Sequence, residues 1–299
     1  MGIIEKAIDR LNAQSGGMSS APLAGAQEAL RSESVANDTF KTRVEEEPGR
    51  ATDTSKNSRL HLSAETFSTA GIATTNGVLP YVADEYRRIK RPVLANAFGN
   101  ESQLTKNGNL VLVTSSLPGE GKSFTAINLA LSIAMERDRT VLLVDADVTK
   151  STTSKMVGLE QHAGLTEALL NENADLADVI VRTDFPCLSI IPSGRRHSHT
   201  AELLASNRMG EILQELATRY PNRIILFDAP PILVTPETQI LCDRMGQIIF
   251  VVEMGVTPRN IVSQALALLP NDEKPVGLVL NKARKLSGSK DYGGYGYGD

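Results

Sequence analysis

The chain has 299 residues, with 35 acidic and 31 basic side chains and a formal net charge of −4. Hydrophobic residues make up 41% of it, enough for a sizeable core in one large domain or two small ones. The mild acidity argues against a nucleic-acid partner, and we find neither a secretory signal nor an apolar run of the roughly 20 residues that span a bilayer. Two unrelated cysteines form no disulfide framework or zinc site, so we expect an intracellular, reduced protein.

The N-terminal third divides into two parts. Residues 1–12 place apolar side chains at helical spacing and predict a short amphipathic helix, which either docks on its own domain, frays, or binds a partner. Residues 13–78 are rich in Ser, Thr, Ala, Asn, Glu and Gly. Such a composition buries too little apolar surface to offset chain entropy, so we expect a flexible linker.

Residues 79–283 show the pattern of an α/β domain. Short runs rich in Val, Ile and Leu, typical of strands buried on both faces, occur at 110–114, 140–145, 188–192, 223–228, 247–253 and 275–281. Helical patterns separate them at 123–136, 163–170, 201–219, 235–244 and 258–269. This alternation predicts a three-layer fold with a mainly parallel central sheet, and it places the ligand beyond the carboxyl ends of the strands.

A glycine-rich turn follows the first of these strands. The sequence 115–123 ends in Gly-Lys-Ser, as the Walker A motif does, although Ser116 stands where the strict pattern has glycine. Lys122 is predicted to reach the β- and γ-phosphates, and the Ser123 hydroxyl to hold Mg²⁺. An ordinary glycine turn is the alternative. The residues predicted to bind ATP here are Ser116, Leu117, Pro118, Gly119, Glu120, Gly121, Lys122, Ser123 and Phe124.

Three carboxylates end two of the other strands. Asp145 and Asp147 follow the strand 140–145, and Asp228 ends the strand 223–228 in the Walker B pattern. Each aspartate alone could be a helix cap. Beside a P-loop they become metal ligands or bases, and we expect Ser123, Asp147 and Asp228 to place Mg²⁺.

The segment 284–299 is polar and glycine-rich, and it holds Tyr292, Tyr295 and Tyr297, half of the six tyrosines. This composition predicts a tail that is disordered when free. Tyrosines there are either part of a low-complexity tail or phosphoacceptors, and the P-loop favours the second interpretation.

The order of Walker A, then VLLVDAD, then ILFDAPP resembles the bacterial tyrosine kinases, in particular the exopolysaccharide- and exosortase-associated autokinases of the MinD/ParA-like P-loop superfamily. Leu117 stands where MinD/ParA ATPases carry a signature lysine. Thr149 stands where the kinases carry an arginine, with Lys150 next to it, so the arginine's contribution is in doubt or passes to Lys150.

The resemblance implies an autokinase that uses ATP and Mg²⁺ and phosphorylates its tail tyrosines in trans within a ring-shaped homo-oligomer. It implies catalytic roles for Lys122, Asp145, Asp147 and Asp228, with Asp145 as the base, although Asp145 and Asp147 could exchange roles. Asn281 is expected to read adenine, or else to be a turn residue at a strand end.

Glu85, Arg88 and Arg91 match the family's Glu-x-x-Arg-x-x-Arg element, and they form either a subunit interface or a solvated helix face. The implied partners are a separate membrane protein that activates the kinase and a tyrosine phosphatase. A membrane partner implies that the chain lies in the cytoplasm, peripheral to the inner membrane. The rival function is a ParA/MinD-like switch ATPase without kinase activity.

Overall fold

A computed structural model describes residues 80–283, except 101–103, 172–174, 186, 198–199 and 271–273. The predicted N-terminal helix 1–12, the linker 13–78 and the tail 284–299 with its three tyrosines lie outside the described residues.

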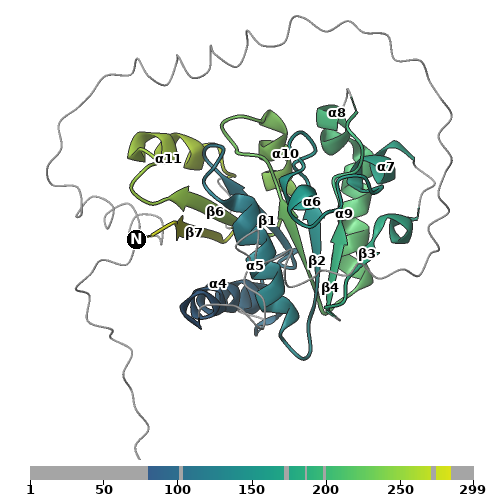
Figure 1. Cartoon of the computed structure of the whole chain (residues 1–299), viewed down its shortest axis with the longest axis horizontal. Helices are drawn as coiled ribbons and strands as arrows, with labels where there is room; N and C mark the ends of the chain where they lie inside the picture. The colour runs from purple at the N-terminus through teal and green to yellow at the C-terminus, as the bar shows by residue number, and fades with distance from the viewer. Residues whose placement is uncertain are drawn as a thin grey trace, which may run out of the picture. The chain divides into compact units, whose positions relative to one another are not determined.

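The strands form one seven-stranded sheet in the order β3-β4-β2-β5-β1-β6-β7. All pairs are parallel except β3 with β4, as expected for a mainly parallel sheet. Figure 1 shows this sheet in the middle of the molecule. Its strands are β1 (Leu110–Ser115), β2 (Thr140–Asp145), β3 (Val181–Arg182), β4 (Leu188–Ile191), β5 (Arg223–Asp228), β6 (Gln247–Glu253) and β7 (Val276–Asn281).

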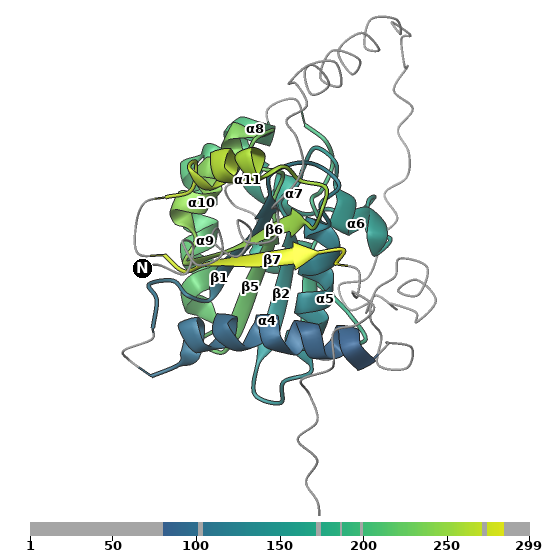
Figure 2. The ribbon, with the colours of Figure 1, turned by 90° about the vertical axis from the view of Figure 1, so that its left-hand side faces the viewer.

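Helices cover both faces of the sheet, and Figure 2 shows α5 and α6 on one side and α8 to α11 on the other. The helices are α4 (Pro80–Phe98), α5 (Lys122–Ala134), α6 (Thr152–Met156), α7 (Leu165–Leu170), α8 (Thr200–Ala205), α9 (Asn207–Arg219), α10 (Pro236–Arg244), α11 (Arg259–Leu266) and the 3₁₀ helix η2 (Leu176–Val179).

Alternate residues of each central strand enter two separate cores. Leu112 and Phe227 pack with α7 to α11, whereas their neighbours Val113 and Leu226 pack with α4 and α5. Because side chains alternate between the faces of a strand, a strand buried on both faces must be apolar at nearly every position. This is why β2, β5 and β6 coincide with the apolar runs in the sequence.

The structure differs from the sequence prediction in two places. The helix predicted over 201–219 is two helices, because Ser206 ends α8 and its hydroxyl then caps α9 by accepting a hydrogen bond from the Met209 amide. The elements α6, η2 and β3 were not predicted, since each has five residues or fewer and no period to detect. Pro92 lies inside α4 on its exposed side, so the helix continues through it to Phe98.

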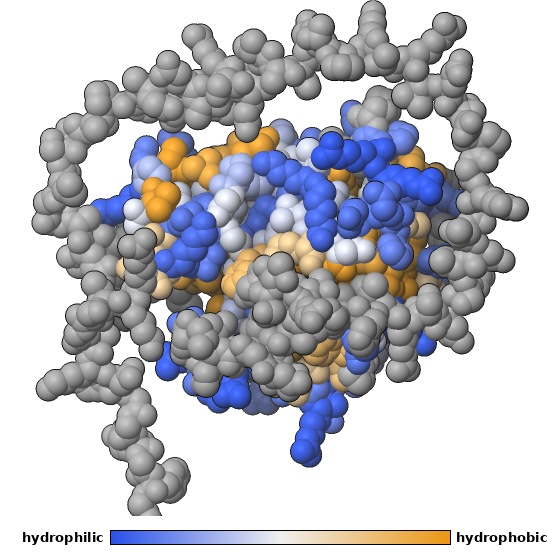
Figure 3. Space-filling model, in the orientation of Figure 1, coloured by the Kyte–Doolittle hydropathy of each residue, from blue (hydrophilic) through white to orange (hydrophobic). Residues whose placement is uncertain are grey.

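The surface beside the carboxyl end of β6 is apolar in part. Met254 and Val256 are 38% and 67% exposed in the turn before α11, and Figure 3 shows orange apolar residues over that helix. Among the described residues, no helix is both long and apolar enough to cross a bilayer.

Candidate active site

The loop between β1 and α5 has the backbone that a phosphate-binding loop requires. Gly119 and Gly121 have φ of 88° and 94°, in the left-handed region that other residues rarely adopt. A Cβ on Gly121 would collide with the side-chain amide of Asn281. The left-handed backbone favours glycine at both positions, and a side chain at Gly121 would also displace the Asn281 amide, so the sequence prediction of a tight loop here is confirmed.

The carboxylate of Glu120 holds this loop from inside. Glu120 is 2% exposed. Its carboxylate accepts a hydrogen bond from the Leu117 amide at 2.6 Å and another from the Thr257 hydroxyl at 2.5 Å. Glu120 was predicted to bind ATP, but its side chain is turned away from the loop opening toward the segment before α11. Its part in nucleotide binding is thus limited to its backbone and to the shape of the loop.

Two residues at the end of β7 hold the loop from outside. The Asn281 side-chain amide donates to the Glu120 carbonyl at 2.8 Å, and Lys282 Nζ donates to the Gly119 carbonyl at 2.8 Å. Lys282 also pairs with Glu253 at 2.9 Å. Asn281 was predicted from the sequence, but Lys282 was not, because its only signal is its place directly after the strand.

An acidic centre lies beside the loop, because β1, β5 and β2 are neighbours and their carboxyl ends meet. Asp145 and Asp228 are register partners on adjacent strands. Lys122 Nζ lies 2.8 Å from Asp147 Oδ2, 3.3 Å from Ser123 Oγ and 3.6 Å from Asp228 Oδ1. The structure thus brings together all four predicted catalytic residues, and the ammonium of Lys122 sits among the three predicted magnesium ligands.

Burial and mutual repulsion determine the protonation of these groups. Burial, then the nearby Asp228, raise the pKa of Asp145 to about 7, although hydrogen bonds from Ser154 oppose the shift. Burial also raises the pKa of Asp228, against the opposing charge of Lys122. For Lys122 burial acts to lower the pKa, but Asp228 and Asp147 outweigh it and the pKa is raised. Lys122 therefore stays charged at neutral pH, while Asp145 is close to its midpoint of titration.

The raised pKa of Asp145 predicts how stability changes with pH. Between about pH 4 and pH 7 the folded protein holds a proton there that the unfolded chain releases, so the free energy of unfolding falls as pH rises, by at most about 1.4 kcal/mol per pH unit. Asp145→Asn cannot ionise. In urea denaturation, the stability of the variant relative to wild type should improve from about pH 5 to about pH 8. A difference that is the same at both pH values would contradict this shift.

The helix α6 supplies hydrogen bonds to two of the carboxylates, and the sequence analysis missed both donors. The Thr153 hydroxyl donates to Asp228 Oδ2 at 2.7 Å. The backbone amide and hydroxyl of Ser154 donate to Asp145 Oδ2 at 2.8 and 2.7 Å. A Thr-Thr-Ser run has no pattern that would indicate such contacts.

The acidic centre fits a hard divalent cation. Among the described residues, the buried Asp228 Oδ1 accepts no hydrogen bond within 3.5 Å, and the lysine ammonium occupies the place of a cation in front of it. The described residues bring no three His, Cys, Asp or Glu side chains together as ligands of one metal ion. Two aspartates and a serine hydroxyl nevertheless suit Mg²⁺, which usually binds one or two carboxylates together with phosphates and water.

A cavity of about 250 Å³ opens in front of the loop. Its lining includes Lys122, Ser123, Phe124, Asp147 and Lys150, among others. Lys150 thus borders the cavity beside the position of the missing family arginine.

Thr149 itself is exposed, and its carbonyl accepts a hydrogen bond from the Arg196 guanidinium at 2.7 Å. The predicted ATP residues Ser116, Leu117, Glu120 and Asn281 are absent from the described cavity lining. The Ser116 side chain is buried, and its hydroxyl has no partner among the described residues.

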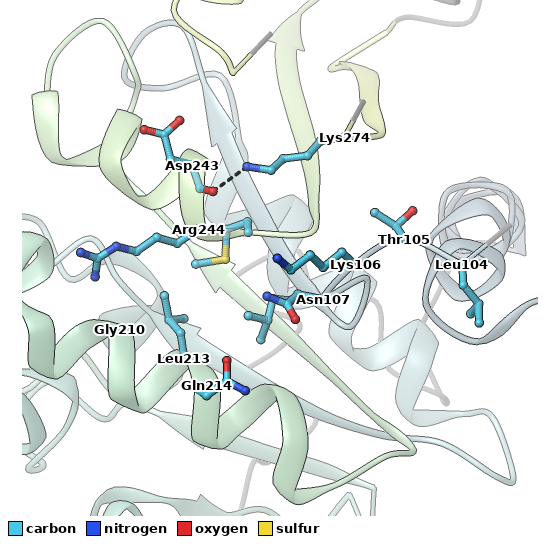
Figure 4. A pocket seen from close by; sticks show the side chains of 12 residues that line it. Leu104, Thr105, Lys106, Asn107, Gly210, Leu213, Gln214, Asp243, Arg244 and Lys274 are labelled. Carbon is cyan, nitrogen blue, oxygen red and sulfur yellow. Dashed lines mark hydrogen bonds between the residues drawn. The ribbon is translucent and has the colours of Figure 1, made fainter. Parts of the chain in front are cut away.

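A larger cavity, of about 640 Å³, lies at the opposite ends of the strands (Figure 4). Lys106, Arg244 and Lys274 are part of its lining, and Lys274 Nζ donates to the Asp243 carbonyl at 2.6 Å. It contains none of the predicted site residues. Because ligands of parallel sheets bind at the carboxyl ends of the strands, the smaller cavity at the P-loop is the candidate active site.

The charged element of α4 lies on the exposed side of that helix. Glu85, Arg88 and Arg91 are all exposed, and no ion pair is found for them within the described part of the chain. Their neighbour Lys90 instead faces inward and pairs with Glu136 at 2.6 Å. The structure is therefore consistent with a free charged face, and the oligomer interface stays a prediction.

The fold and the site together define a P-loop nucleotide-binding protein whose acidic centre lies between neighbouring parallel strands. The AAA domain family matches residues 109–255, which include the P-loop and all three aspartates. Tyrosine-protein kinase YwqD of Bacillus subtilis is 34% identical over 218 residues, which are 73% of this chain and 87% of that protein. The chain therefore belongs to the bacterial tyrosine-protein kinases.

Two further comparisons agree with this family. The kinase domain of VpsO superimposes with a TM-score of 0.55 at 28% identity, over 67% of this chain and 98% of that domain. Tyrosine-protein kinase Wzc of Salmonella typhimurium is 30% identical over 198 residues, which are 66% of this chain but 27% of Wzc. Most of Wzc thus has no counterpart in the match.

Proposed function

We propose that this chain transfers the γ-phosphoryl group of ATP to Tyr292, Tyr295 and Tyr297 in the tail of a neighbouring subunit. The observation that carries the proposal is the acidic centre beside the glycine-rich loop, where the Lys122 ammonium lies 2.8 Å from Asp147 and 3.6 Å from Asp228. Phosphoryl transfer depends chiefly on positioning and charge stabilisation, and this arrangement supplies both.

In the proposed mechanism the backbone amides of 116–123 surround the phosphates, and Asn281 would contact adenine only once its side-chain amide leaves the Glu120 carbonyl. Lys122 leaves the aspartates and follows the negative charge of the phosphates. Ser123, Asp147 and Asp228 would then hold Mg²⁺, which neutralises charge on the β- and γ-phosphate oxygens. Lys150 adds a second cation at the cavity edge.

Asp145 is the proposed acceptor of the tyrosine proton. A general base works best when its pKa is near the working pH, and the pKa of Asp145, about 7, meets this condition. The Asp145 side chain is fully buried, and its oxygens accept hydrogen bonds from Ser154 and from the Asp147 amide. A tyrosine hydroxyl therefore reaches it only after these contacts rearrange, and Asp147, on the cavity wall, is the alternative base.

Two tyrosines of the described region, Tyr86 and Tyr220, are constrained as acceptors. Tyr86 is 7% exposed, and burial raises its pKa to about 12. Tyr220 is 36% exposed, and its ring contacts the guanidinium of Arg223 at 3.9 Å from the ring centre. These constraints support the tail as the site of phosphorylation.

The proposed ring uses the exposed face of α4. Replacing Glu85, Arg88 and Arg91 together with alanine should shift any oligomer toward monomer in light scattering, because the face loses all three charges. Arg87→Ala is a matched control on the same helix, since Arg87 is engaged by Asp84 at 2.6 Å. An oligomer that survives the triple change would rule out this interface.

We further propose that the chain acts in exopolysaccharide synthesis and export in the cytoplasm, bound to the inner membrane through a separate activator protein. The support is the likeness to tyrosine-protein kinases: 87% of YwqD is matched here, but 27% of Wzc. The exposed Met254 and Val256 offer apolar surface close to the P-loop for such a partner. A tyrosine phosphatase would reverse the modification.

Phosphoamino-acid analysis after incubation with radiolabelled ATP and Mg²⁺ tests the activity. We expect phosphotyrosine in the protein. ATP hydrolysis with no label in the protein, with or without the membrane activator, would favour the ParA/MinD-like switch ATPase instead.

A further inference from the structure

The helix α6 presents two consecutive hydroxyl side chains to carboxylates that belong to two different strands. Thr153 reaches Asp228 at the end of β5, and Ser154 reaches Asp145 at the end of β2, both through the Oδ2 atom. All four side chains are buried, with relative exposures of 0%. Hydrogen bonds that offset the burial of a carboxylate also fix its rotamer.

The bond from Thr153 engages one oxygen of Asp228 and restrains the plane of its carboxylate. With Oδ2 engaged at 2.7 Å, Oδ1 points toward Lys122 and, among the described residues, receives no hydrogen bond. The terminal torsion of an aspartate is broad, so a carboxylate without this bond would vary the direction in which its free oxygen points. Thr153 therefore keeps one oxygen available for a cation.

Hydrogen bonds to two other segments hold the helix α6 in place. The Ser151 amide donates to the Asp147 carbonyl at 2.6 Å, and Ser151 has φ of 49°, which turns the chain sharply after β2. The Ser154 hydroxyl also accepts a hydrogen bond, at 3.0 Å, from the backbone amide of Ser193, which lies just after β4. The segments that follow β2 and β4 thus hold α6, and with it the hydroxyls of Thr153 and Ser154.

We propose that Thr153 is a positioning residue for the divalent cation, acting through Asp228, and that α6 as a whole keeps the acidic centre ready for it. This inference rests on the proposed nucleotide and Mg²⁺ site but not on tyrosine phosphorylation. The effect should appear in cation affinity, because outer partners of metal ligands typically contribute 10- to 100-fold to it.

The test measures Mn²⁺ binding to the full chain in the presence of saturating ADP, by electron paramagnetic resonance. Thr153→Val keeps the side-chain shape but removes the donor, and its Mn²⁺ dissociation constant should rise about 10-fold. Thr153→Ser restores the hydroxyl and should return the constant to within about twofold of wild type. Should the valine variant fail to fold, Thr153→Ala removes the same donor.

Thr183→Val is the matched control, because Thr183 is also buried and donates to a carbonyl, that of Leu188, far from the acidic centre. It should bind Mn²⁺ as wild type does. Equal affinity in Thr153→Val and wild type, or an equal loss in Thr153→Val and Thr183→Val, would overturn the proposal. The Mn²⁺ measurement needs no tyrosine acceptor, so it is independent of the kinase function. If the wild type binds Mn²⁺ with ADP but forms no phosphotyrosine, the proposed kinase function fails and the proposal for Thr153 can still be tested.

Discussion

Replacing Lys122 with methionine should lower tyrosine phosphorylation by at least roughly 100-fold, which is the usual cost of removing one preorganised donor from a charged transition state. The reason is that Lys122 is the one ammonium that contacts both Asp147 and Asp228 in the described site. No other lysine in the described residues replaces it there. Phosphotyrosine formation and circular dichroism, measured together, check the loss of activity and the retention of fold.

Lys90→Met is the matched control for this variant. Lys90 is 8% exposed, as Lys122 is, and it is paired with Glu136, but it lies on α4 away from the P-loop. Both variants lose a buried, paired ammonium, and only Lys122→Met should lose activity. Phosphorylation that persists in Lys122→Met would exclude the P-loop mechanism.

Replacing Tyr292, Tyr295 and Tyr297 with phenylalanine should remove nearly all autophosphorylation while ATP binding and slow hydrolysis continue. The change takes away three hydroxyl nucleophiles and leaves Lys122 and the aspartates untouched. Tyr220→Phe is the control, because Tyr220 is a partly exposed tyrosine of the described surface and should not contribute. Label that moves to Tyr81, Tyr86 or Tyr220 would contradict the assignment of the tail.

Mixing two variants that cannot phosphorylate their own tails tests transfer between subunits. Lys122→Met protein with an intact tail should become labelled when it is incubated with active protein that lacks the tail tyrosines. The label should be on the Lys122→Met chain. An unlabelled mixture, under conditions in which wild type labels well, would show that transfer does not occur in trans.

The sheet and the loop could be predicted from the sequence because each requires particular residue types within one short stretch of the chain. Strands buried on both faces must be apolar throughout, so β5 appears in the sequence at its true residues. The P-loop needs glycine at Gly119 and Gly121, and those glycines are visible as a motif. Asp145 and Asp228 were recognisable because each ends an apolar run.

The contacts made across the fold were not predictable in this way. Thr153 and Ser154 bind carboxylates 75 and 9 residues away in the chain, and Lys282 reaches Gly119 across 163 residues. Nothing in a short run of hydroxyl residues specifies such partners. The inward turn of Glu120 likewise depends on Thr257, which the fold alone brings near.

The most direct test of the proposed kinase function is mass spectrometry of the purified protein after incubation with ATP and Mg²⁺, with and without the membrane activator. The account predicts phosphate on Tyr292, Tyr295 and Tyr297, and none there in the Lys122→Met protein incubated alone. ATP turnover with an unmodified tail, or tail phosphate of equal amount in the Lys122→Met protein, would contradict it.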